Sequence, residues 1–147
     1  MTLNHLRSSA FICGCLAFAV TAQAAVTATD AWVRGTVPAQ KTTGAFLTLE
    51  SSEDAKLVAV STPAAKSTEI HESRQMQGMM QMRAVDEVPL PAGKRVELKP
   101  GGFHLMLVEL SRPLVAGDSV PLTLTIEDRH GKRSKVEVNA PVRPLGR

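Results

Sequence analysis

Short hydrophobic runs alternate with polar breakers along most of the chain after residue 24. Runs rich in Val, Leu, Thr and Ile are separated by Gly, Pro, Ser and Asp, which is typical of strands joined by turns. No window combines the helical period with capping residues. The pattern predicts strands at Val26–Arg34, Gly44–Ser51, Lys56–Ser61, Ser67–Glu72, Met79–Val85, Lys94–Leu98, Phe103–Leu110, Val120–Asp128 and Ser134–Val138. Many short strands at this spacing predict an all-β fold, either a two-sheet sandwich or a small barrel.

Two of these runs show clear alternation. Leu122, Leu124 and Ile126 face one side of their strand, which predicts a core face, and the Arg129–Lys132 segment then predicts the last turn. In Phe103–Leu110 the residues Phe103, Leu105 and Leu107 share one face, which predicts a second core face.

On that strand His104 and Met106 share the face opposite the core face. They follow one another about 6–7 Å apart along the strand, because side chains repeat every second residue. A core strand does not need a histidine and a methionine side by side on its second face. This pair therefore calls for a chemical explanation.

The first 24 residues have the order of a secretory signal peptide. Arg7 precedes an apolar run from Ala10 to Val20, and small residues end at Ala24. The run is too short to span a bilayer. We expect residues 1–24 to be removed during export to the periplasm, leaving one domain at 25–147. Lipidation at Cys15 is the alternative, but few apolar residues precede that cysteine.

Composition excludes several functions for the mature chain. Both cysteines, Cys13 and Cys15, lie in the leader, so we expect no disulfide and no thiolate site, including the blue-copper type. The net charge of +3 is mild and aromatic residues are few, which argues against nucleic-acid partners. No catalytic motif is present, so we predict that the protein is not an enzyme. We expect a monomer without a membrane span.

Four of the six methionines are crowded into Met76–Met82. Methionine commonly fills gaps in a core, and this interpretation accounts for Met79 and Met80. It does not account for methionine in the polar, glycine-containing segment Arg74–Gly78, which we expect to be a hairpin loop. The crowding therefore suggests a second role for some of these thioethers.

A second His–Met pair lies on either side of that loop. His71 ends one predicted strand and Met82 lies in the next, so a hairpin brings them within cross-strand reach. Together with His104 and Met106 they would form a site of two imidazoles and two thioethers. Thioethers are poor ligands for Zn²⁺ or Mg²⁺ and good ones for Cu(I). The imidazoles add affinity and make binding weaken in acid, because protons compete with the metal.

The spacing of these four residues resembles the signature of the periplasmic copper chaperone family PCuAC. Ten residues separate His71 from Met82, and twenty-one separate Met82 from His104-Leu105-Met106. The resemblance extends to Asp30-Ala31-Trp32-Val33-Arg34, Glu69-Ile70-His71-Glu72, Met80-Gln81-Met82-Arg83 and the run from Leu98 to Met106.

This resemblance implies a cupredoxin-like Greek-key β-sandwich that binds one Cu(I) per chain at a solvent-accessible site. It also implies delivery of copper to an accepting protein during cytochrome c oxidase assembly, either an oxidase subunit or an Sco-type thiol protein. Some members carry a His/Met-rich tail. This chain has no His or Met after His130, so we expect no second site there.

Two other functions remain open at this stage. A periplasmic copper buffer without a dedicated client could have the same metal site. A metal-free interaction module is also compatible with the fold, because a fold does not determine function. Cu(I) binding would distinguish the chaperone from the metal-free module. Transfer of copper to a partner would distinguish the chaperone from the buffer.

The remaining marked residues have simpler interpretations. Met80 alternates with Met82 and could line the same face as a spare ligand, but we favour packing for Met80, and we expect Trp32 to anchor the core. Met76 and His130 are interpreted as loop and turn residues. Glu72 and Arg83 flank predicted ligands and are interpreted as solvated charges.

Overall fold

The computed structural model describes residues 24–145 and folds them into strands without a helix, so the all-β prediction is confirmed. None of these residues forms a helix long and apolar enough to cross a membrane. The predicted signal peptide and Cys15 lie outside the described residues, apart from Ala24. The strands are β1 (Val26–Arg34), β2 (Thr42–Ser51), β3 (Ala55–Ser61), β4 (Ala65–Met76), β5 (Met79–Val85), β6 (Val88–Leu90), β7 (Arg95–Leu98), β8 (Phe103–Leu110), β9 (Ser119–Asp128) and β10 (Arg133–Arg143).

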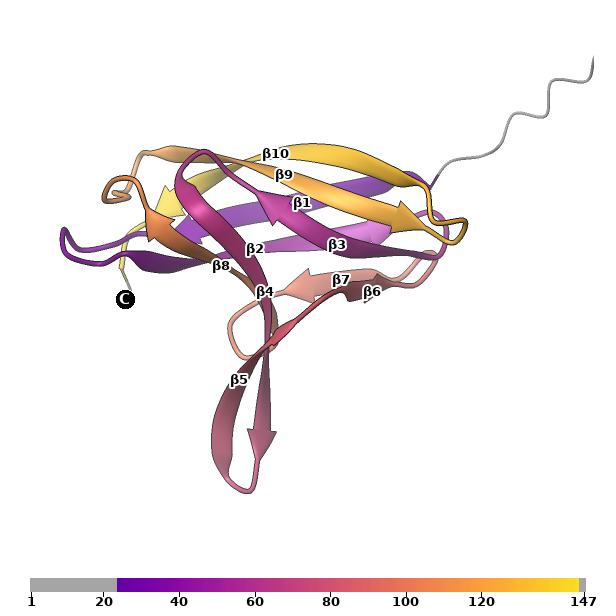
Figure 1. Ribbon diagram of the computed structural model, residues 1–147, viewed down its shortest axis with the longest axis horizontal. Coiled ribbons are helices and arrows are strands. Elements are labelled where there is room, and N and C mark those ends of the chain that lie inside the picture. Colours follow the sequence, from indigo (N-terminus) through magenta and orange to yellow (C-terminus); the bar gives the residue numbers. More distant parts are fainter. Residues whose placement is uncertain (1–23, 146–147) are drawn as a thin grey trace, which may run out of the picture.

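The strands form two layers that share one continuous hydrogen-bonded path. The order is β5-β4-β8-β2-β1-β10-β9-β3-β6, with β7 also paired to β2. β10 links the layers, because it pairs antiparallel with β9 and, near its end, parallel with β1. The β4–β5 hairpin extends away from the body of the sandwich (Figure 1).

The core lies between the inner faces of the two layers. Leu105 and Leu107 of β8 are fully buried, and so are Leu122 and Leu124 of β9. Ile126 is only 1% exposed, which confirms the core face predicted for β9. Each such side chain contributes about 1.5–3 kcal/mol when it is removed from water. Because the inner face of β8 is occupied by leucines, its His104 and Met106 are turned to the other face of the sheet.

The structure differs from the sequence-based prediction around the hairpin and at one edge. β4 continues to Met76, so the loop expected at Arg74–Gly78 is wrong and only Gln77 and Gly78 form the turn. β6 was not predicted, since it contains Pro89. Proline is tolerated there because β6 is the last strand of its layer and needs no further ladder partner.

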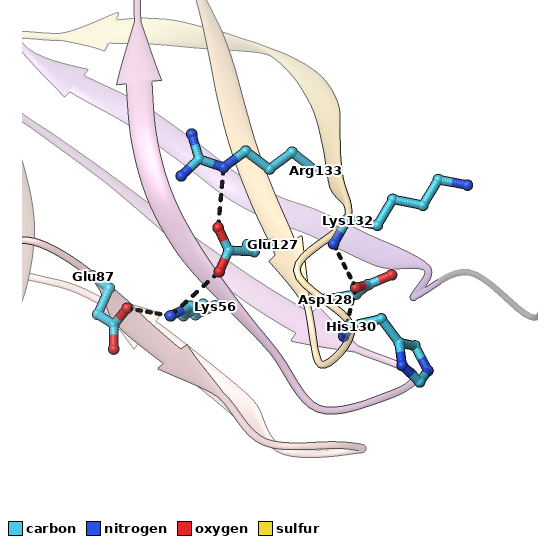
Figure 2. A network of polar contacts seen from close by, with 7 residues as sticks. All are labelled: Lys56, Glu87, Glu127, Asp128, His130, Lys132 and Arg133. Carbon is cyan, nitrogen blue, oxygen red and sulfur yellow. Dashed lines mark hydrogen bonds and ion pairs between the residues drawn. The ribbon is translucent and has the colours of Figure 1, made fainter.

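Charged groups pair with one another at the end of the sandwich that carries the β9–β10 turn (Figure 2). Lys56 Nζ lies 2.7 Å from Glu87 and 3.4 Å from Glu127, whose carboxylate also accepts a hydrogen bond from Arg133 Nε.

In the β9–β10 turn, the backbone N–H groups of residues 130 and 132 donate to Asp128 Oδ1 at 2.9 Å or less. These bonds, led by that of residue 132, lower the pKa of Asp128. The turn predicted at Arg129–Lys132 is confirmed.

Candidate metal centre

Two histidines lie directly opposite each other on neighbouring strands. β4 pairs antiparallel with β8 in a register that places His71 across from His104 and Glu69 across from Met106. The two imidazole centroids are 5.8 Å apart, with planes inclined by 52°. The register thus brings two imidazoles and one thioether together on the outer face of the sheet.

His71 has one ring nitrogen without a partner. Its Nε2 lies 2.7 Å from Glu69 Oε2, and because a carboxylate only accepts hydrogen bonds, Nε2 carries the proton. In the neutral imidazole Nδ1 is then the unprotonated acceptor. It is buried and has no hydrogen-bond partner among the residues that the structure describes. Unpaired buried polar atoms are rare and destabilising, so this nitrogen points to a ligand that binds there.

His104 is held by the backbone and is only 5% exposed. Its Nδ1 lies 3.1 Å from the carbonyl oxygen of Gly102, so Nδ1–H donates and Nε2 keeps its lone pair. The same carbonyl accepts the backbone N–H of Ser73 at 3.0 Å, which ties the turn before β8 to β4. Orientation of a ligating imidazole by its other ring nitrogen is the usual arrangement in metal sites.

The two methionines differ in their surroundings. Met106 is half-buried between β4 and β2, whereas Met82 lies on the hairpin, opposite Ser73, and is 60% exposed. Both contribute with His104 to the lining of a surface pocket of about 280 Å³, which does not include His71. Three of the four predicted ligands therefore share a pocket, and His71 adjoins it through the ring of His104.

The aromatic ring of Phe46 lies beside His104, on the side of β8 away from His71. The ring centroid of Phe46 in β2 lies 6.4 Å from that of His104. Phe46 can fold back along its strand because residue 44 is glycine: a Cβ at Gly44 would lie 2.8 Å from Phe46 Cζ. Gly44 is also the cross-strand partner of Met106. Neither residue could be identified from the sequence, since only the non-local pairing of β2 with β8 brings them to the site.

The row of rings continues to Trp32, which is not the core anchor expected from the sequence. Trp32 is only partly buried, and its centroid lies 4.5 Å from that of Phe46. The guanidinium groups of Arg143 and Arg34 lie over Trp32 and Phe46, at 4.8 and 5.5 Å from the ring centroids. These cation–π contacts cover the outer face where no second sheet does.

An ion-pair cluster closes the base of the hairpin on the face opposite His71. Glu72 accepts hydrogen bonds from Arg83 Nε and Nη2 at 3.1 and 2.9 Å, and Arg74 Nε lies 3.0 Å away. Arg83 and, to a lesser degree, Arg74 lower the pKa of Glu72 and keep it ionised. Glu72 and Arg83 are therefore paired across β4 and β5 rather than separately solvated.

The remaining methionines of the hairpin are exposed. Met76, Met79 and Met80 expose 52%, 65% and 59% of their surface. The core-filling interpretation of Met79 and Met80 is therefore wrong, because no second layer covers either face of this hairpin (Figure 1).

Comparisons with known proteins agree with this architecture. The family model described as "LpqE-like: Putative lipoprotein LpqE-like" matches residues 26–142. A relative from Leifsonia xyli subsp. xyli, "Putative lipoprotein Lxx21020", is 32% identical over 114 residues, which are 77% of this chain and 68% of the relative.

Two solved structures are similar over most of the chain. The "Apo PCuAC domain from PmoF1" has a TM-score of 0.65 at 22% identity and covers 81% of this chain and 93% of its own. "CuI-DR1885 from Deinococcus Radiodurans" has a TM-score of 0.59 at 32% identity, over 80% of this chain and 76% of its own. The resemblance to PCuAC and the expected cupredoxin-like β-sandwich are thereby confirmed.

Proposed function

This chain belongs to the LpqE-like family, and we propose that it is a metallochaperone that binds one Cu(I) ion through His71, Met82, His104 and Met106. In this role it binds and transfers the ion and catalyses no reaction. The observation that carries the proposal is the buried, unpartnered Nδ1 of His71 beside the ring of His104.

The donor set favours Cu(I) over other ions. In the neutral rings, the hydrogen bonds of the other nitrogens leave Nδ1 of His71 and Nε2 of His104 without a proton, so both can donate a lone pair. Met106 and Met82 add soft, neutral thioethers. Within residues 24–145 no group of three or more His, Cys, Asp or Glu is arranged for a metal, so a hard-ion site has no support.

Similarity to a copper-bound protein supports the same ion. DR1885, 32% identical to this chain, has been solved with Cu(I), as its description states. The similarity covers 80% of this chain.

The unequal burial of the ligands suits transfer rather than storage. His104 is buried, and its ring is oriented by the hydrogen bond to the Gly102 carbonyl. Met82, in contrast, is exposed on a hairpin that a partner can approach. A partner ligand could replace Met82 first, while the remaining three hold the ion. A site of this kind should release copper more readily than a thiolate site.

We propose that the protein acts in the periplasm after removal of residues 1–24, and that its client is a copper site of cytochrome c oxidase or an Sco-type thiol protein. The family description names lipoproteins, which makes Cys15 lipidation the alternative to cleavage after Ala24. The mass of the mature protein distinguishes them, since the first residue is then Ala25 or a lipid-modified Cys15.

Copper transfer tests the chaperone proposal. The processed protein, loaded with one equivalent of Cu(I), is mixed anaerobically with a metal-free copper-binding domain of cytochrome c oxidase or an Sco-type protein. We expect transfer faster than Cu(I) release to a chelator of equal affinity, because the acceptor attacks at Met82. Equal rates would show dissociation without a client and would favour the copper-buffer alternative.

A further inference from the structure

The tip of the β4–β5 hairpin carries a second pair of methionines. Met76 and Met79 are cross-strand partners on either side of the turn, and both are more than half exposed. Side chains alternate along each strand, so this pair lies on the hairpin face opposite Met80 and Met82. The hairpin extends from the sandwich, which leaves both of its faces open (Figure 1).

The turn geometry keeps this pair close together. Gln77 and Gly78 both have positive φ, 51° and 78°, as a two-residue type I′ turn requires. Such a turn closes the hairpin directly after its last pair, so the Cβ atoms of Met76 and Met79 are held about 5 Å apart. Two flexible thioether side chains starting from this separation can reach a single ion between them.

Packing does not explain these side chains. An apolar residue stabilises the fold by leaving water, but both methionines retain most of their contact with water. The next pair on the same face contains Arg74, whose charge would oppose a cation. Glu72, which lies 3.0 Å from Arg74 Nε, offsets part of that charge, because the same carboxylate also pairs with Arg83.

We propose that Met76 and Met79 form a second, weaker binding site for a soft monovalent cation, separate from the His/Met centre. The inference rests on the proposed function only for the identity of the natural ion, Cu(I). A site with thioethers alone lacks the imidazole donors, so we expect its affinity to be at least about tenfold lower. It would bind the ion at the tip of the hairpin, on the face opposite the one that carries Met82 of the main centre.

Methyl NMR of the processed protein tests this site, with Ag(I) as a soft probe that resists redox change. The first equivalent is expected to shift the methyl signals of Met82 and Met106, and further Ag(I) those of Met76 and Met79. The Met76→Leu, Met79→Leu variant lacks these two reporters, so its Ag(I) stoichiometry is measured by calorimetry: it should lose the weaker equivalent and keep the first. The matched control Met80→Leu, on the opposite face, should keep both.

A His104→Ala, Met106→Ala variant separates the two proposals. If Met76 and Met79 still respond in it, the second site is independent of the main centre, and it stands even if the main centre proves wrong. The inference is overturned if the two methyl signals stay unmoved at a tenfold excess of Ag(I), or if the Met76→Leu, Met79→Leu variant still binds the weaker equivalent of Ag(I).

Discussion

The β4–β5 and β9–β10 hairpins are both antiparallel pairs of strands, but β9 packs one face against the core whereas β5 is almost entirely exposed. β9 alternates regularly and buries Leu122, Leu124 and Ile126, and its turn is fixed by the Asp128 carboxylate. β5 exposes nearly all of its residues, including the methionines Met79, Met80 and Met82.

This difference teaches how to recognise a functional strand. Where apolar side chains serve only to stabilise the fold, they are buried, as in β9. In β5 the methionine side chains are exposed, so they need another explanation, and the proposed binding of copper supplies one. If this is correct, changes in the two hairpins should separate stability from metal binding.

The largest expected effect on stability is in β9. Leu124→Ala removes a fully buried side chain and should lower the free energy of unfolding by about 2–5 kcal/mol. Met80→Ala removes an exposed side chain and should change it by no more than about 0.5 kcal/mol. Urea denaturation of the metal-free proteins measures both. Similar losses in the two variants would contradict the contrast between the hairpins.

A smaller effect on stability, combined with one on the metal centre, is expected at Gly44. In Gly44→Ala the new methyl group would lie 2.8 Å from Phe46 Cζ, so the ring must move away from its position beside His104. We expect a loss of about 1–3 kcal/mol from overpacking and several-fold weaker Cu(I) binding. Fluorescence of Trp32, which stacks on Phe46, reports the displacement.

A second substitution tests that explanation. Phe46→Leu in the Gly44→Ala background removes the collision and should recover part of the lost stability. If the double variant is no more stable than Gly44→Ala alone, the cost arises elsewhere than at the ring.

The smallest expected effect is the pH dependence of the β9–β10 turn. The folded-state pKa of Asp128 lies below its ordinary value of 3.8, so the carboxylate stabilises the fold above that value. This stabilisation is lost as the pH falls through the lowered pKa. Asp128→Ala should therefore lower the urea midpoint at pH 7, and the difference from the wild type should shrink below about pH 4.

The exposed Asp86, outside this turn, provides the control. Asp86→Ala should leave the midpoint nearly unchanged at both pH values. A loss for Asp128→Ala that persists unchanged in acid would show that its carboxylate charge is not the source.

Sequence periodicity predicted what depends on neighbours along the chain. The faces of β8 followed from alternation alone, including the shared outer face of His104 and Met106. The hairpin that carries His71 and Met82 followed from local turn residues. Register between distant strands could not be predicted in this way: it is His104, not Met82, that lies opposite His71.

The same limit explains the residues that were misjudged or missed. Phe46 and Gly44 reach the site only through the pairing of β2 with β8. Met79, Met80 and Trp32 were expected in the core because their side chains are large and apolar. Which face of a strand a second layer covers is decided by tertiary packing, and it leaves these three at the surface.

Anaerobic Cu(I) titration of the processed protein against a competing chelator tests the central claim most directly. It compares the wild type with His104→Ala, Met106→Ala and, as a control, His130→Ala in the β9–β10 turn. We predict one tight equivalent for the wild type and the control, and its loss in the double variant. Equal binding by all three proteins, or binding by none, would contradict the four-ligand centre.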